Sequence, residues 1–190
     1  PTDLPRHKSL MAAMTWSHSL LKEPERKVFR ALSVFNGSFS LEAALAVAGA
    51  GEAESLSELV RKSLVVKDGN NKALYRLLET SRHFARDQLL SHKEVAEARR
   101  RHAAYFTTLF KASLDACEDL TDRQWLDVYR SETDNLRAAL DWLQEQALWQ
   151  DYADLCAASY RLWLETGLYR EGMSHCERAL HALENVPDRD

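Results

Sequence analysis

A tight turn between two short apolar segments is the feature that most restricts how this chain folds. The segments "SLVV" (63–66) and "ALYRLL" (73–78) flank Asp68-Gly69, and glycine adopts the positive φ angles that such hairpin turns need. Apolar residues at intervals of three and four, typical of helices, occur on both sides of the hairpin. The sequence therefore predicts a small two-stranded wing beside helices, the arrangement of a winged helix-turn-helix domain.

The residues before the hairpin supply the helices of this domain, which we expect to span residues 1–92. Pro24 suits the first turn of a helix, and Ser40 is a typical N-cap for the helix that follows "NGS" at 36–38. The predicted helices cover 9–21, a segment from Pro24 that includes Phe35, 41–49 and 53–63.

Only helical patterns follow the hairpin, and we expect a second domain over residues 93–190. Thr121 and Gln124 form a capping box. The predicted helices cover 80–91, 94–118, a segment from Thr121 to Leu143, 150–166 and 168–185. Trp163, Gly167 and Ala179 match part of the tetratricopeptide pattern. The predicted fold class is mainly α: a winged helix-turn-helix with a two-stranded wing, followed by an α-helical, tetratricopeptide-like repeat region.

Composition and motifs point away from an enzyme. The sequence contains no P-loop, no zinc-ligand spacing and no nucleophile motif, so we expect no catalytic residue, metal or cofactor in this segment. Three widely spaced cysteines favour reduced thiols and a cytoplasmic location, and no apolar run is long enough for a membrane span. The chain begins at Pro1 rather than methionine, which suggests a fragment of a longer protein.

The charge pattern argues against DNA binding by the winged helix. Residues 1–92 carry 13 basic and 10 acidic residues, whereas residues 93–190 carry 12 basic and 19 acidic ones. The helix at the position of a DNA-recognition helix, "EAESLSELVRKSL" (52–64), carries Glu52, Glu54 and Glu58 in its N-terminal half, and these would repel phosphates. Its basic residues and those of the wing form a possible partner surface: Arg61, Lys62, Lys67, Lys72 and Arg76.

Several segments resemble the bacterial STAND-type signalling ATPases, which act as transcriptional regulators. They are "RHKSLMAAMTWSHSLL" (6–21), "ERKVFRALSVFNGSFSLEAALAVAG" (25–49), "LVRKSLVV" (59–66), "YRLLETSRHFARDQL" (75–89) and "ETDNLRAALDW" (132–142). The resemblance implies an upstream P-loop ATPase domain that binds ATP or ADP, with this winged helix as an intramolecular switch. It further implies that the helical repeats sense a partner protein or small-molecule inducer.

Many members of that family carry Met-His-Asp just after the wing, where the histidine contacts the ADP phosphate. The resemblance places Leu77, Leu78 and Glu79 at these positions, so the phosphate-binding histidine is replaced by Leu78. Two interpretations remain open. Glu79 caps the following helix, or His83, one turn later, supplies the missing donor. Leu78, Glu79 and His83 are therefore the candidate nucleotide-sensing positions.

The sequence leaves two main functional hypotheses. In the first, the chain is a non-catalytic regulatory fragment of a STAND-type ATPase. In the second, it is a DNA-binding winged-helix transcription factor with a helical effector domain. A third idea, that tryptophans of the second domain line a small-molecule pocket, competes with their use in a helical core.

Overall fold

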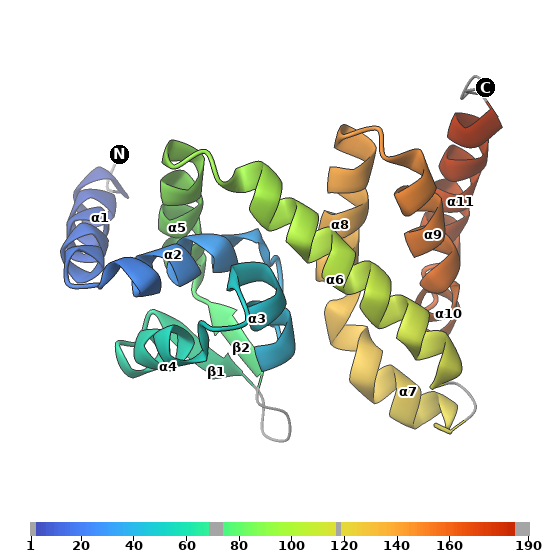
Figure 1. Ribbon diagram of the computed structural model, residues 1–190, viewed down its shortest axis with the longest axis horizontal. Helices are drawn as coiled ribbons and strands as arrows, with labels where there is room; N and C mark the ends of the chain where they lie inside the picture. Colours follow the sequence, from blue (N-terminus) through green and yellow to red (C-terminus); the bar gives the residue numbers. More distant parts are fainter. Residues whose placement is uncertain (1–2, 69–73, 117–118, 185–190) are drawn as a thin grey trace. The chain divides into compact units, whose positions relative to one another are not determined.

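The computed structural model describes residues 3–68, 74–116 and 119–184. The chain separates into two compact units, residues 1–98 and 99–190, shown with their helices in Figure 1. The division falls inside one long helix, whereas the sequence indicates a boundary before that helix, between residues 92 and 93; those domain bounds stay a prediction.

The first unit is a winged helix-turn-helix preceded by one extra helix. Its elements are α1 (Asp3–Ser19), α2 (Glu23–Ala31), α3 (Leu41–Ala48), α4 (Ala53–Arg61), β1 (Val65–Asp68), β2 (Leu74–Leu77) and α5 (Glu79–Ser91), with a 3-10 turn, η1 (Leu32–Val34), after α2. The strands pair antiparallel, with Val65 opposite Leu77. The two-stranded wing is as the sequence predicts, and Phe39 adds one isolated bridge to Tyr75 that the sequence did not indicate.

Apolar side chains of the first unit gather between the helices and the sheet. Phe29 and Leu32 from the α2 segment are completely buried, as is Leu59 from α4. Phe35 stacks on Phe39 with ring centroids 4.4 Å apart. Ser40 caps α3 as expected, since its hydroxyl accepts a hydrogen bond from the Ala43 backbone N–H at 3.1 Å.

The second unit is entirely helical among the residues that the structure describes there, 99–116 and 119–184. It contains most of α6 (Val95–Asp115), then α7 (Asp122–Tyr129), a 3-10 turn η2 (Arg130–Glu132), α8 (Thr133–Glu145), α9 (Trp149–Ala158), α10 (Tyr160–Glu165) and α11 (Tyr169–Glu184). Trp125 and Tyr152 are completely buried, and the Trp125 indole N–H donates to the Ser113 carbonyl at 3.1 Å. The predicted capping box of α7 is present.

Three helices expected to be continuous are interrupted. The segment from Pro24 ends as an α-helix at Ala31 and continues only as η1, so Phe35 lies outside it. The segment from Thr121 to Leu143 divides at η2, and the segment 150–166 divides at Ser159. At both places a hydroxyl bonds to a helix carbonyl: Thr133 Oγ1 to Arg130 at 2.8 Å, and Ser159 Oγ to Leu155 at 2.6 Å. Such bonds compete with the regular helix ladder and bend helices. Gly167 ends α10 with a φ of 73°, as its position in the sequence suggests.

Candidate functional site

The wing face, formed by α4 and the strands, is where a DNA-reading winged helix would contact its target. The exposed residues of α4 include Glu54, Ser57 and Arg61. The Arg61 guanidinium forms a close ion pair with Glu58 on the same helix, and this contact holds the pKa of Glu58 below its usual value. The exposed arginine of α4 is therefore already paired with a carboxylate.

The other predicted partner residues of this face are also largely engaged inside the unit. Lys62 turns inward, and its Nζ lies 2.6 Å from the buried carboxylate of Glu25. Arg76 lies 3.6 Å from Asp68 across the wing, and Asp68 accepts a hydrogen bond from Ser38. Lys67 is exposed on β1, whereas Lys72 lies outside the described residues. The structure thus brings Arg61 and Lys67 to one pocket, places Arg76 at another, beside Glu79 and Arg82, and turns Lys62 toward Glu25.

The α5 corner, defined here by Leu78, Glu79, Arg82 and His83, holds the predicted nucleotide-sensing positions. Leu78 is the N-cap residue of α5, and 43% of its surface is exposed. Glu79 occupies the first turn, where its carboxylate contacts Arg82 and His83 at 2.7 Å each. The bond from Arg82, followed by the contact with His83, lowers the pKa of Glu79.

Arg82 belongs to this corner but was not among the predicted site residues. Its guanidinium donates to Asn36 Oδ1 at 3.1 Å and to Glu79 at 2.7 Å. Arg76, Glu79 and Arg82 line a polar pocket beside the end of β2. The spacing of Glu79 and Arg82, three residues apart on one helix, is the signal that indicates their pairing. The hydrogen bond with Asn36 joins residues 46 positions apart and has no local signal.

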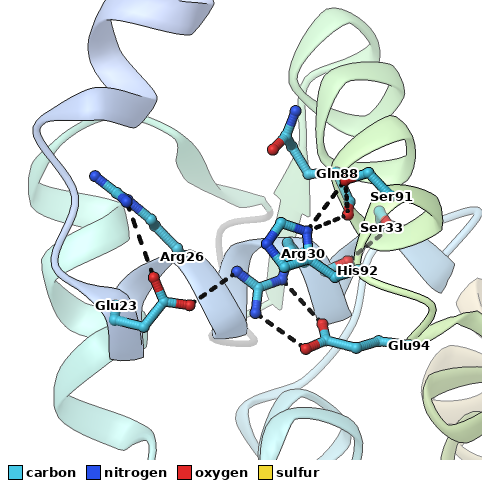
Figure 2. Close-up of polar contacts among 8 residues, drawn as sticks. All are labelled: Glu23, Arg26, Arg30, Ser33, Gln88, Ser91, His92 and Glu94. Atoms are coloured by element: carbon cyan, nitrogen blue, oxygen red, sulfur yellow. Dashed lines mark hydrogen bonds and ion pairs between the residues drawn. The ribbon is translucent and has the colours of Figure 1, made fainter.

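The Arg30 cluster is the most extensive buried charge arrangement described in the first unit. Figure 2 shows the Arg30 guanidinium between Glu23 and Glu94. Arg30 donates to both carboxylate oxygens of Glu94, at 2.9 and 3.1 Å, and to Glu23 at 3.2 Å. The Arg30 side chain is 4% exposed. Hydrogen bonding by Arg30 lowers the pKa of Glu94, so the pair is fully ionised near neutral pH and ties the residue just before α6 to α2.

His92 completes the view in Figure 2 at the end of α5. Its Nδ1 lies 2.8 Å from the Gln88 carbonyl and 3.1 Å from the Ser91 hydroxyl. This position lets the imidazole interact with the last carbonyls of the helix, which carry partial negative charge. His92 therefore has a structural role at the end of α5, next to the ion pair of Arg30 and Glu94.

Among the residues with described positions, no cluster of three or more His, Cys, Asp or Glu side chains has a geometry suited to a metal ion. No helix in the described part of the chain combines the length and apolar character needed to cross a membrane.

Comparison with known proteins identifies the class of the first unit. Residues 21–90 match the model of the winged helix-turn-helix domain family. A protein of Mycobacterium tuberculosis that is provisionally named an HTH-type transcriptional regulator is 37% identical over 176 residues, covering 89% of this chain and 20% of that protein. A Mycobacterium bovis protein with the same provisional description matches equally. An uncharacterized M. tuberculosis protein is 40% identical over 91 residues, covering 43% of this chain and 23% of that protein.

The chain therefore contains a winged helix-turn-helix domain and is homologous to proteins named as transcriptional regulators. It spans about a fifth of the length of the first of these relatives. No solved structure matches the chain significantly.

Proposed function

We propose that this chain is a non-catalytic regulatory part of a longer, cytoplasmic STAND-type ATPase that controls transcription. The winged helix acts as an intramolecular switch against a P-loop ATPase domain N-terminal to it. The helical unit recognises a partner protein or an inducer through tetratricopeptide-like repeats. ATP and ADP are cofactors of the ATPase domain, and this chain contributes no catalytic group. The resemblance of five segments to that family supports this proposal, as does the homology to long regulators.

The observation that carries the proposal is the charge arrangement on the wing face. Non-specific DNA affinity comes from basic side chains that neutralise phosphates. On α4, Glu54 and Glu58 outnumber Arg61, which is itself paired with Glu58. Because Lys62 is directed toward Glu25, little free positive charge is presented where a DNA-recognition helix needs it.

The α5 corner supports a contact with another domain. Leu78 is an exposed apolar residue at the start of α5, beside the polar pocket with Arg76 and Arg82. An apolar side chain at this position suits packing against protein, and the two arginines are donors suited to an anionic group. The proposed surface for the ATPase domain and its bound nucleotide is therefore the α5 corner.

The test uses the natural full-length protein and measures its affinity for ADP. Leu78→Glu places a carboxylate in the proposed contact, so we expect ADP affinity to fall at least about tenfold, roughly 1.4 kcal/mol. Leu90→Glu is the matched control, because Leu90 is 56% exposed on the same helix, and it should leave ADP affinity unchanged. Equal ADP affinity of the Leu78→Glu variant and the wild type would refute the switch contact.

A second candidate function, DNA binding by the winged helix itself, is favoured by the family match and by the names of the relatives. It predicts binding to duplex DNA that weakens steeply with salt, with Arg61→Ala reducing the salt slope by about one. Our proposal instead predicts no binding: labelled DNA duplexes of random sequence should show no change in fluorescence anisotropy when the protein is added at about 50 mM salt. Robust binding that Arg61→Ala weakens would favour the second candidate over the first.

A further inference from the structure

A groove in the helical unit lies between α6 and the helices α8 and α9. Its volume is about 360 Å³, which falls within the range of pockets that hold small molecules, roughly 300–1,000 Å³. Such pockets combine an apolar lining with a few polar groups that orient the ligand. The residues that line this groove show the same combination.

The deeper part of the groove is apolar. Ala103, Leu143 and Trp142 line it and are 1, 3 and 6% exposed. On the α6 side, Ala103 and Ala104 have small side chains, which leave space beside the larger residues of α8. Trp142 therefore borders a cavity, as the small-molecule hypothesis requires, whereas Trp125 is completely buried.

Two ion pairs hold α6 against the helices on the other side of the groove. Arg99 Nη1 lies 2.7 Å from a carboxylate oxygen of Glu145 at the end of α8. Lys111 Nζ lies 2.7 Å from a carboxylate oxygen of Asp154 on α9. Lys111 follows Arg99 by 12 residues, which is about 18 Å along a helix. The two ion pairs therefore mark the two ends of the groove.

The charged residues of the lining, Arg100 and Asp151, lie toward opposite ends. Arg100 directly follows Arg99, whereas Asp151 precedes Asp154 by about one helical turn. The α6 part of the lining extends from Arg100 to Thr107, about 10 Å along the helix axis. Asp151 is exposed and makes no hydrogen bond or ion pair with the residues that the structure describes. The groove thus has an apolar centre, a guanidinium near one end and a carboxylate near the other.

We propose that this groove binds a small zwitterionic molecule with an apolar body, whose carboxylate pairs with Arg100 and whose ammonium group pairs with Asp151. A guanidinium suits a carboxylate because it donates parallel N–H bonds. The apolar body lies against Trp142 and Leu143, where it leaves water. A ligand with one charged group would leave one end of the groove unmatched, and such complementarity determines which ligand binds.

This inference rests on the part of the proposed function in which the helical unit recognises an inducer, and it names the site and the chemical class of that inducer. The measurement uses the 190-residue chain without nucleotide. A negative result therefore leaves the contact at the α5 corner standing, and a failed ADP measurement leaves the groove standing.

The probe is 8-aminooctanoate, which carries a carboxylate and an ammonium group at the two ends of an eight-carbon chain. Titration of the 190-residue chain, followed by saturation-transfer NMR of the probe, measures the affinity. We expect a Kd on the order of 1 mM, because the ligand is small and its charged ends stay partly in water. Octanoate and octylamine each lack one charged end, so they should bind at least about threefold more weakly.

A variant that fills the groove locates the binding site. Ala104 is exposed at the groove, so Ala104→Phe occupies the space without adding bulk to the core. This change should weaken binding of 8-aminooctanoate at least about tenfold. Ala112→Phe is the matched control, because Ala112 is exposed on the same helix and lies outside the groove lining. It should leave the affinity unchanged.

Two further variants assign the charged ends. Asp151→Asn should weaken binding of 8-aminooctanoate about threefold and leave binding of octanoate unchanged, because octanoate has no ammonium group. Arg100→Gln should weaken binding of octanoate about threefold and should not weaken binding of octylamine, which has no carboxylate.

Three results would overturn the proposal. The first is no saturation transfer with 8-aminooctanoate at about 10 mM, or binding that Ala104→Phe leaves unchanged. The second is equal affinity for the three probes, which would indicate an apolar occupant such as a side chain of a partner protein. The third is a dimer of the 190-residue chain, detected by light scattering, that Ala104→Phe dissociates, because the occupant would then be a second copy.

Discussion

The helices α4 and α11 each present an outward face, and the two faces differ in kind. On α4 the outward residues are charged and pair with one another, as Glu58 and Arg61 do. On α11 the outward residues Met173 and Leu180 are apolar and more than half exposed. A charged face whose residues pair with one another is stable in contact with water. An apolar stripe is stabilised when another surface covers it.

The contrast extends to the interior of the two units. The first unit places ion pairs in protected positions, with Arg30 held by Glu94 and Glu23. The described interior of the second unit includes aromatic packing, such as Trp125 against Tyr129 at 4.7 Å, and a buried histidine, His102. The two units should therefore respond differently to loss of a charge and to acid.

Among the predicted substitutions, Glu94→Gln in the first unit should lower the free energy of unfolding the most. This change leaves the buried Arg30 guanidinium with one carboxylate partner, Glu23, whose side chain is 67% exposed. Removing one member of a fully buried pair typically costs 3–5 kcal/mol, but the Glu94 side chain is 38% exposed and Glu23 remains, so we expect a loss of about 2–3 kcal/mol. Urea denaturation at pH 7 measures it.

The pH dependence of the same variant provides a second readout. Because Arg30 lowers the pKa of Glu94 in the fold, the ionised pair stabilises the protein above the unfolded pKa of about 4.3. That contribution is lost as pH falls through the folded pKa, and Glu94→Gln should remove it. Adding Arg30→Met to Glu94→Gln should recover part of the loss, since no buried charge then lacks a partner. A fully additive double variant would contradict this account of the cluster.

The second largest expected effect is a loss of stability of the helical unit in acid. Burial lowers the pKa of His102 to about 3, although a hydrogen bond with Asn135 acts in the opposite direction. The folded pKa lies below the unfolded value of about 6.5, so stability from neutral His102 is present above that value and is lost as pH falls toward 3. Between pH 7 and pH 5 we expect the helical unit to lose roughly 2 kcal/mol.

Tryptophan fluorescence reports on the helical unit selectively, because four of the five tryptophans follow residue 98. Trp16→Phe removes the remaining one, which is 66% exposed. In that background, urea denaturation at pH 7 and pH 5 measures the loss, and His102→Gln should reduce it. The same loss with and without His102→Gln would show that other groups cause the acid response.

Local signals in the sequence predicted much of the fold. The sequence on either side of Asp68-Gly69 indicated the two paired strands, Ser40 and Thr121 marked helix starts, and Gly167 marked a helix end, all confirmed by the observed elements. The predicted turn at Gly69 itself lies outside the described residues. Each depends on backbone preferences of a few adjacent residues, which a single sequence displays directly.

Features that depend on distant residues or on unusual backbone were not predictable in the same way. Arg30 and Glu94 are 64 positions apart, and Lys62 turns toward Glu25 because of tertiary packing. Helix ends at Ser63, Lys93 and Ala147 have positive φ angles of 59, 60 and 53° without glycine, so the usual signal is absent. The nucleotide-sensing roles of Leu78, Glu79 and His83 stay a prediction.

Gly172→Ala tests how tightly the inner side of α11 is packed, in contrast to its outer stripe. The new Cβ would lie 2.8 Å from the Trp163 ring, so the helix or the indole must shift. Overpacking of this kind costs about 1–3 kcal/mol, partly offset by the roughly 1 kcal/mol that alanine gains in a helix. We expect a net loss of about 1 kcal/mol in urea denaturation. Gly51→Ala is the control, because an added Cβ there meets no atom within 4 Å.

The smallest effect on folding is expected at the α5 corner. Leu78 is 43% exposed, so Leu78→His should change the free energy of unfolding of the 190-residue chain by no more than about 0.5 kcal/mol. Against this nearly neutral background, a change in the ADP affinity of the natural full-length protein reports on the contact itself. A rise in affinity would place residue 78 beside the nucleotide, because histidine adds a donor for phosphate. A fall would indicate an apolar domain contact, which an imidazole weakens. An unchanged affinity combined with a large loss of stability would mean that Leu78 supports the packing of α5 and that the corner is not a docking surface.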